Sequence, residues 1–180
     1  MDFVSPKSYT FSDEVLAALE MVDQGTVLER VPLVYAANGA HPILEQTARA
    51  VQGRTAGVHL IEIDAMVTTQ TCDIRGLGAR TKPFLTVAPV YPARFLTNNP
   101  LRALRLRTYT VPLTGARFSA ELHIADLRFE STIEKGIVVG RGCHPPFVEA
   151  SEYAELAKKL GESRRRAAFD PTIEKYLLKP

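Results

Sequence analysis

Residues 58–73, VHLIEIDAMVTTQTCD, join an apolar segment to a polar one, and this junction constrains the fold more than any other stretch of the chain. From Val58 to Val67 the side chains are mostly apolar and often β-branched, which is typical of a buried strand. From Thr68 to Asp73 they are polar and include Cys72, one of only two cysteines. A rigid strand that ends in short polar side chains can present them to a cleft, so we expect functional residues here.

The remaining segments predict a mainly β protein with helices at both ends. Ser12 is a suitable N-cap for a helix whose apolar residues repeat at helical spacing until Gly25. Ser151 begins a second helix, which Gly161 should end before a basic helix from Ser163. Strands are expected at 26–36, 84–90, 108–113, 118–129 and 137–139, with Pro32 marking an edge or a bulge, and further helical segments at 42–51 (or a long loop) and 101–106.

Short strands joined by turns favour a small, strongly curved antiparallel barrel, because closure removes exposed strand edges. We therefore expect residues 1–150 to form a single β-barrel domain that includes the N-terminal helix. Residues 151–180 are expected to form a C-terminal helical appendage.

Composition excludes several classes of protein. The net charge of +2 provides no global field for nucleic acid, and the hydrophobic and charged fractions of 46% and 23% are those of a globular protein. Two distant cysteines do not form a disulfide framework, no signal-peptide pattern is visible, and no apolar run approaches the roughly 20 residues of a membrane span. We expect a cytoplasmic protein with free thiols, no membrane partner and no cofactor.

Cys72 and Asp73 are the first candidate catalytic residues. The thiol could act as a nucleophile if a histidine lowered its pKa, with Asp73 orienting that base. The alternative is that Cys72 is a small buried hydrophobe and Asp73 caps a turn. His144 follows Gly142 and Cys143 in a rigid loop, so it could complete a Cys72/His144/Asp73 constellation, or Cys72, Cys143 and His144 could bind zinc. His144 could equally be a loop residue with no role.

A second reading of the same residues is RNA cleavage, which needs a base for the 2′-hydroxyl, a cation for the phosphate and an acid for the leaving oxygen. Arg54, Asp73 and His144 are the candidate catalytic residues for that reaction. Nucleic-acid contacts are expected from Arg75, Arg80, Arg164 and Arg165, although a run such as 164–166 often forms a solvated helix face.

The order of segments resembles the PemK/MazF family of small β-barrel proteins. The resemblance rests on TTQTCDI (Thr68–Ile74), FLTVAPV (Phe84–Val90), VPLTGARFSAELHIADLRFEST (Val111–Thr132) and the closing Glu134-Lys135-Gly136. It covers about Gly25 to Gly136. It implies an SH3-like barrel and a toxin–antitoxin endoribonuclease, or a relative recruited to phage defence. Two segments depart from the family pattern: Arg54 and Gly57 stand where an Arg-Pro pair is usual before the central strand, and Val90 and Tyr91 replace a threonine after the proline of the second strand.

Three functions follow from these observations. The first is a nucleic-acid-binding, PemK-like barrel that acts as an endoribonuclease on RNA. The second is a non-catalytic adaptor on the same barrel, with a protein partner bound through the terminal helices; whatever its function, the chain could also form a homodimer. The third is a cysteine-dependent enzyme that uses Cys72.

Overall fold

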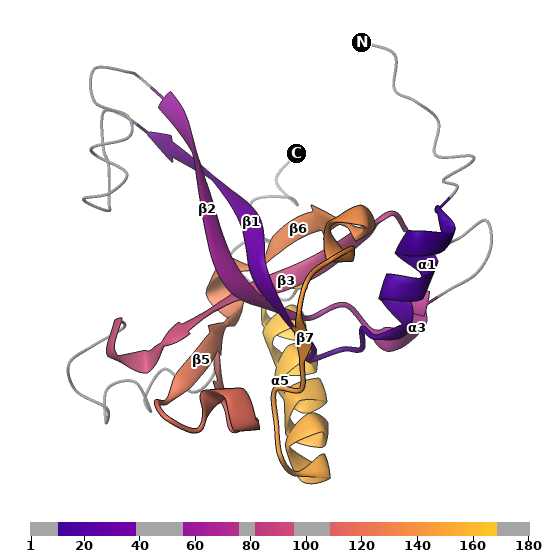
Figure 1. The fold of residues 1–180 in the computed structure, drawn as a ribbon. Helices are drawn as coiled ribbons and strands as arrows, with labels where there is room; N and C mark the ends of the chain where they lie inside the picture. Colours follow the sequence, from indigo (N-terminus) through magenta and orange to yellow (C-terminus); the bar gives the residue numbers. More distant parts are fainter. Residues whose placement is uncertain (1–10, 39–55, 76–81, 96–108, 169–180) are drawn as a thin grey trace, which may run out of the picture.

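The computed structural model describes residues 11–38, 56–75, 82–95 and 109–168. The helices and strands in these ranges follow one another as shown in Figure 1: α1 (Asp13–Glu20), β1 (Val27–Asn38), β2 (Ala56–Val67), α3 (Thr71–Arg75), β3 (Phe84–Pro92), β4 (Thr110–Leu113), β5 (His123–Asp126), β6 (Ser131–Glu134), β7 (Cys143–His144) and α5 (Ala150–Ala168). Four 3-10 turns lie between them: η1 (Ala93–Phe95), η2 (Ala116–Phe118), η3 (Leu127–Phe129) and η4 (Lys135–Val138). The predicted helical segments at 42–51 and 101–106 lie outside the described residues.

Within the described ranges, the strands form one antiparallel sheet of seven strands, in the order β4-β5-β3-β2-β1-β7, with β6 also paired to β3. The prediction of a mainly antiparallel β protein with added helices is therefore confirmed. Among the described residues, β4 and β7 are the two edges of this order and do not pair with each other, so the sheet is open. The expected closure into a barrel is not confirmed.

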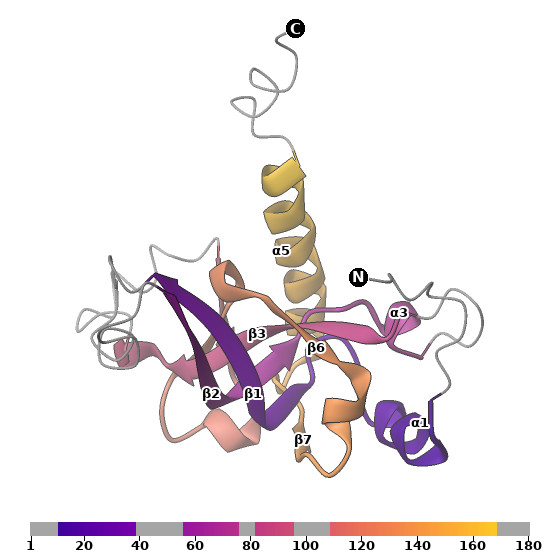
Figure 2. The same cartoon turned by 90° about the horizontal axis from the view of Figure 1, so that it is seen from above.

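β1 and β2 extend beyond the rest of the sheet as a two-stranded ribbon (Figures 1 and 2). They pair along their whole length, whereas β2 pairs with β3 only over Ala65–Val67 and β1 with β7 only at Val27 and Leu28. Pro32 lies in this ribbon opposite Glu62, at a point where β1 has β2 as its only paired neighbour among the described strands. This position suits a residue without an N–H group, and it fits the predicted edge.

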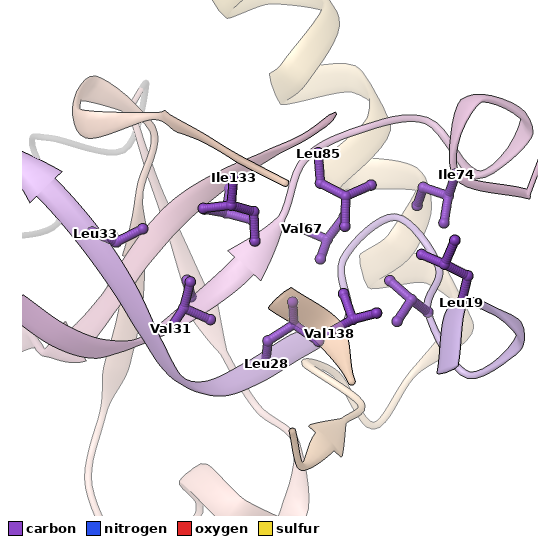
Figure 3. Close-up of a cluster of buried hydrophobic side chains, with 12 residues drawn as sticks. Leu19, Leu28, Val31, Leu33, Val67, Ile74, Leu85, Ile133 and Val138 are labelled. Atoms are coloured by element: carbon purple, nitrogen blue, oxygen red, sulfur yellow. The ribbon is translucent and has the colours of Figure 1, made fainter. Parts of the chain in front are cut away.

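Two apolar clusters cover opposite faces of the sheet. Successive side chains of a strand point to opposite faces, so Ala65 and Val67 enter one cluster and Met66 the other. The first cluster, shown in Figure 3, packs Leu19 of α1 against strands β1, β2, β3 and β6. The second contains Leu156 and Leu160 of α5. Both terminal helices therefore bury their apolar sides on the sheet.

The helices differ in part from expectation. Ser12 caps α1 as predicted, because its side chain accepts a hydrogen bond from the N–H of Val15. The predicted stop at Gly161 is wrong: α5 continues through it to Ala168. Glycine costs about 1 kcal/mol inside a helix, and burial of Leu156 and Leu160 to 2% exposure offsets that cost.

The predicted strand over 118–129 is also wrong in its extent. Strand β5 covers only His123–Asp126, and turns η2 and η3 occupy the two ends of the predicted segment. The side chain of Asp126 accepts a hydrogen bond from the N–H of Arg128, and this contact turns the chain out of the strand. Residues 137–139 likewise begin in turn η4 rather than in a strand.

Candidate functional site

A β-bulge in β1 brings together the first two residues of the candidate site. Leu28 pairs with Ala65 and Val31 with Ile63, so Glu29 and Arg30 together face one residue, Asp64. Arg30 has a φ of 50°, a left-handed conformation that costs a non-glycine residue about 1–2 kcal/mol. Its N–H donates to Asp64 Oδ1 at 3.1 Å, which helps to hold that conformation. The bulge places the carboxylates of Glu29 and Asp64 near each other.

Arg117 connects these two carboxylates. Its Nη1 donates to Glu29 Oε1, and its Nη2 donates to Asp64 Oδ2 at 3.0 Å. Turn η2 presents Arg117 in this direction because the next residue, Phe118, is buried in the second apolar cluster. Both N–H groups of Thr114 and Gly115 donate to the carbonyl of Pro146, which ties η2 to the segment that follows β7.

His144 completes the site from β7. Pairing of His144 with Val27 brings its ring to Glu29, and Nε2 lies 2.8 Å from Glu29 Oε1. An ionised carboxylate can only accept a hydrogen bond, so Nε2 carries the proton in this contact. Arg117 Nη1 lies 3.3 Å from the same nitrogen. Glu29, Asp64, Arg117 and His144, from four separate elements, are called the bulge cluster below.

The electrostatics of the bulge cluster favour an ionised Glu29. The hydrogen bond from His144 lowers the pKa of the Glu29 carboxyl below its ordinary value. Partial burial opposes this shift, and the positive charge of Arg117 adds to it. The side chains of the four residues are between 24% and 39% exposed, so they are ordered by contacts but open to solvent on one side. A ligand can therefore reach them.

Two further arginines lie around the bulge. Arg141 Nη1 donates to the carbonyl of Arg30 at 2.6 Å. The side chain of Arg30 is 74% exposed and pairs with Glu62 at 2.6 Å. Of the three guanidinium groups, that of Arg117 contacts the Glu29 carboxylate, whereas those of Arg30 and Arg141 contact Glu62 and the Arg30 carbonyl.

The structure separates Cys72 and Asp73 from His144. Both lie in α3, which contacts α1 and lies apart from β7 in Figures 1 and 2. Cys72 is an exposed free thiol whose Sγ lies 3.8 Å from Gln70 Oε1. The buried Lys135 donates from Nζ to the carbonyls of Asp73 and Ile74, at 2.8 Å each, and so caps the end of α3. The expected Cys72/His144/Asp73 constellation is not assembled.

The other predicted residues have varied positions. Cys72, Cys143 and His144 do not form a zinc site, because no group of three or more Cys, His, Asp or Glu within the described ranges could hold a metal ion. Arg75 pairs with Asp23 at 2.8 Å and donates to the carbonyl of Glu20. Arg164 and Arg165 lie in α5, and Arg54 and Arg80 lie outside the described residues.

Sequence reasoning identified His144 and missed its three partners. Glu29 and Asp64 are acidic residues in strands that also contain the charged Arg30 and Glu62, which is a weak signal for a polar site. Arg117 had no signal beyond its place in an arginine-rich half of the chain. Arg117 is 88 positions from Glu29 and 53 from Asp64, so only the fold brings them together.

Comparison of the chain with protein-family models, with curated proteins and with solved structures gave no match. In the described part of the chain, no helix combines the length and the apolar character that crossing a membrane requires.

Proposed function

We propose that the protein binds RNA and cleaves its backbone at the bulge cluster. Cleavage through the 2′-hydroxyl needs a base, an acid and a cation within reach of one phosphate. The observation that carries the proposal is the mutual contact of a carboxylate, an imidazole and a guanidinium in Glu29, His144 and Arg117, on a partly exposed surface.

Each side chain has a distinct role in this reaction. Glu29 accepts the proton of the 2′-hydroxyl, whose oxygen then forms a bond to phosphorus. Protonated His144 donates a proton to the 5′-oxygen as the bond from phosphorus to that oxygen breaks. Arg117 stabilises the charge that builds on the phosphoryl oxygens. The products are a 2′,3′-cyclic phosphate and a 5′-hydroxyl. The scissile phosphate enters between Glu29 and His144 and replaces their direct contact.

We further propose that the chain forms a PemK/MazF-like barrel with a toxin–antitoxin or phage-defence role. What supports it is the order of the segments together with the curved β1–β2 ribbon (Figure 2). The catalytic residues differ from those predicted from the sequence, since His144 acts here with Glu29 and Arg117 rather than with Asp73 and Arg54.

Purified protein and a fluorescently labelled oligoribonucleotide test the proposal. We expect the wild type to cleave the RNA, and Glu29→Gln and His144→Ala each to lose on the order of 10²- to 10⁴-fold in rate. Cys72→Ser and Arg75→Ala, at exposed positions on α3, should cleave at the wild-type rate. Loss of activity in Cys72→Ser with retention in Glu29→Gln would instead identify a cysteine-dependent enzyme.

One observation favours the adaptor function as a second candidate. Val34 and Leu60 pair across the ribbon and are 58% and 62% exposed, which gives the ribbon an apolar surface. The apolar residues Leu19, Leu156 and Leu160 of the terminal helices are buried, so we place a protein partner on the ribbon rather than on those helices. An adaptor should retain its partner in Glu29→Gln and lose it in Leu60→Ser when complexes are isolated from cells.

A further inference from the structure

Gly142 lies directly against the carboxylate of Glu29. A Cβ atom at position 142 would be 2.7 Å from both Cδ and Oε2 of Glu29, which is closer than packed carbon and oxygen atoms approach. The carbonyl of Gly142 also accepts a hydrogen bond from the N–H of Glu29 at 3.0 Å. Backbone and side chain of Glu29 are thus both held against this one glycine.

The backbone of Gly142 does not itself require glycine. The glycines with positive φ among the described residues are Gly25 and Gly140, so alanine can adopt the conformation at 142. The atoms that an alanine would meet belong to the end of the Glu29 side chain, which can rotate. Gly142→Ala should therefore fold, and it should displace the carboxylate rather than the strand.

We infer that Gly142 is a positioning residue, and that the space above its Cα fixes the Glu29 carboxylate against His144 and Arg117. The contacts of the bulge act in the same direction. Arg141 holds the carbonyl of Arg30 while Asp64 holds its N–H, so the backbone on the other side of Glu29 cannot move to compensate. The position of Gly142 matters because a displaced Glu29 carboxylate would no longer lie beside His144 and Arg117, where the proposed reaction needs it.

The test compares Gly142→Ala with Gly136→Ala, a matched control in which the added Cβ meets nothing within 4 Å. Carboxyl ¹³C NMR should show the pKa of Glu29 rising towards its ordinary value of 4.5 in Gly142→Ala and unchanged in Gly136→Ala. An unchanged titration of Glu29 in Gly142→Ala would overturn the inference.

A thermodynamic cycle provides a second readout that needs no activity. If alanine at 142 acts only by displacing the Glu29 side chain, Gly142→Ala should lower the melting temperature in the wild type but not in a Glu29→Ala background. An equal decrease in both backgrounds would show a purely structural role for Gly142 and contradict the inference.

The effect on catalysis rests on the proposed function and is measured separately. In Gly142→Ala we expect kcat for RNA cleavage to fall about 10- to 100-fold with a smaller change in KM, because the base is misplaced while the binding surface remains. A wild-type protein that cleaves no RNA would overturn the proposed function. The NMR titration and the thermodynamic cycle would still decide the role of Gly142.

Discussion

Glu29 Oε1 and His144 Nε2 lie 2.8 Å apart, although 115 positions separate these residues in the chain. Two backbone pairs, Val27 with His144 and Leu28 with Cys143, produce this contact by adding β7 to the first residues of β1. The bulge then directs Glu29 towards the histidine. A short strand and one extra residue thus assemble the candidate acid and base.

Replacement of Arg117 by lysine should impair catalysis more than stability. An ammonium group cannot donate two parallel hydrogen bonds in the way that a guanidinium does, so Glu29 and Asp64 can no longer be held together. We expect kcat/KM for RNA cleavage to fall at least about 10-fold. The ion pairs of Arg117 with Glu29 and Asp64 are partly exposed and screened by solvent, so the melting temperature should change little. Arg94→Lys, in the exposed pair with Glu121, is the control, and an equal loss of activity there would contradict this role for Arg117.

The hydrogen bonds around the buried Asp126 should contribute strongly to stability. Asp126 is fully buried, and its carboxylate accepts hydrogen bonds from Tyr91 and from Nε and Nη2 of Arg128. Asp126→Ala removes the acceptor of these hydrogen bonds and should cost about 1.5–3 kcal/mol, because Arg128 is 34% exposed and water can replace part of the lost contact. Tyr91→Phe removes one hydrogen bond and should cost about 1 kcal/mol. Urea unfolding measures both values, and an Asp126→Ala loss below that of Tyr91→Phe would contradict this role of Asp126.

The same hydrogen bonds predict how stability depends on pH. Burial alone would raise the pKa of Asp126, but the hydrogen bonds from Arg128 and Tyr91 outweigh it and lower the pKa. The stabilisation of the fold by ionised Asp126 is therefore present above about pH 4 and is lost as the pH falls towards the lowered pKa of Asp126. Burial and the bond to Asp126 raise the pKa of Tyr91. The stabilisation of the fold by un-ionised Tyr91 is therefore present below about pH 10 and is lost as the pH rises further. Urea unfolding midpoints measured across pH should fall less at alkaline pH in Tyr91→Phe than in the wild type. An equal alkaline fall in both proteins would contradict this role of Tyr91.

The two thiols should differ in reactivity. Cys72 is exposed, whereas burial raises the pKa of the Cys143 thiol and the Glu29 carboxylate raises it further. Because the thiolate is the reactive form, iodoacetamide at neutral pH should label Cys72 well before Cys143. Mass spectrometry of the labelled peptides gives the two rates. Labelling of Cys143 faster than Cys72 in the native protein would contradict the partly buried placement of the Cys143 thiol near Glu29.

Lys135 should be essential for the placement of α3. Its side chain is fully buried, its Nζ donates to two carbonyls at the end of α3, and it lies 5.4 Å from the ring of Phe11. Lys135→Met keeps the apolar stem but leaves both carbonyls without this donor, and should cost about 2–4 kcal/mol in urea unfolding. Lys158→Met, at an exposed position of α5, should cost less than about 0.5 kcal/mol. Equal effects of the two substitutions would contradict the capping role of Lys135.

The sequence predicted elements better than it predicted their ends. Residues 58–67 are a strand as expected, because apolar β-branched side chains favour that conformation whatever the register. Among residues 60–67, whose side chains the structure describes, only Ala65, Met66 and Val67 are buried, and Leu60 in the ribbon is 62% exposed. Burial of the β2 side chains depends on which other strands pair with β2 and β1, and the local sequence of β2 does not contain that information.

The candidate site could be predicted only in part for the same reason. Gly142, Cys143 and His144 indicated a rigid loop, and His144 is in the bulge cluster. The partners of His144 depend on the register of β1 with β2 and β7, and a single extra residue in β1 changes which side chains share a face. Cys72 drew attention as a rare residue type, but its short helix lies beside α1 and not beside His144.

The most direct test of the account is the chemistry of the cleaved RNA. Wild-type protein is incubated with an oligoribonucleotide, and the same oligonucleotide is tested with 2′-deoxyribose at the cleaved position, with mass spectrometry of the products. We expect a 2′,3′-cyclic phosphate and a 5′-hydroxyl from the ribose substrate, no cleavage of the deoxy substrate, and formation of both products slowed on the order of 10²- to 10⁴-fold by Glu29→Gln. Cleavage of the deoxy substrate, or equal cleavage by Glu29→Gln, would contradict the account.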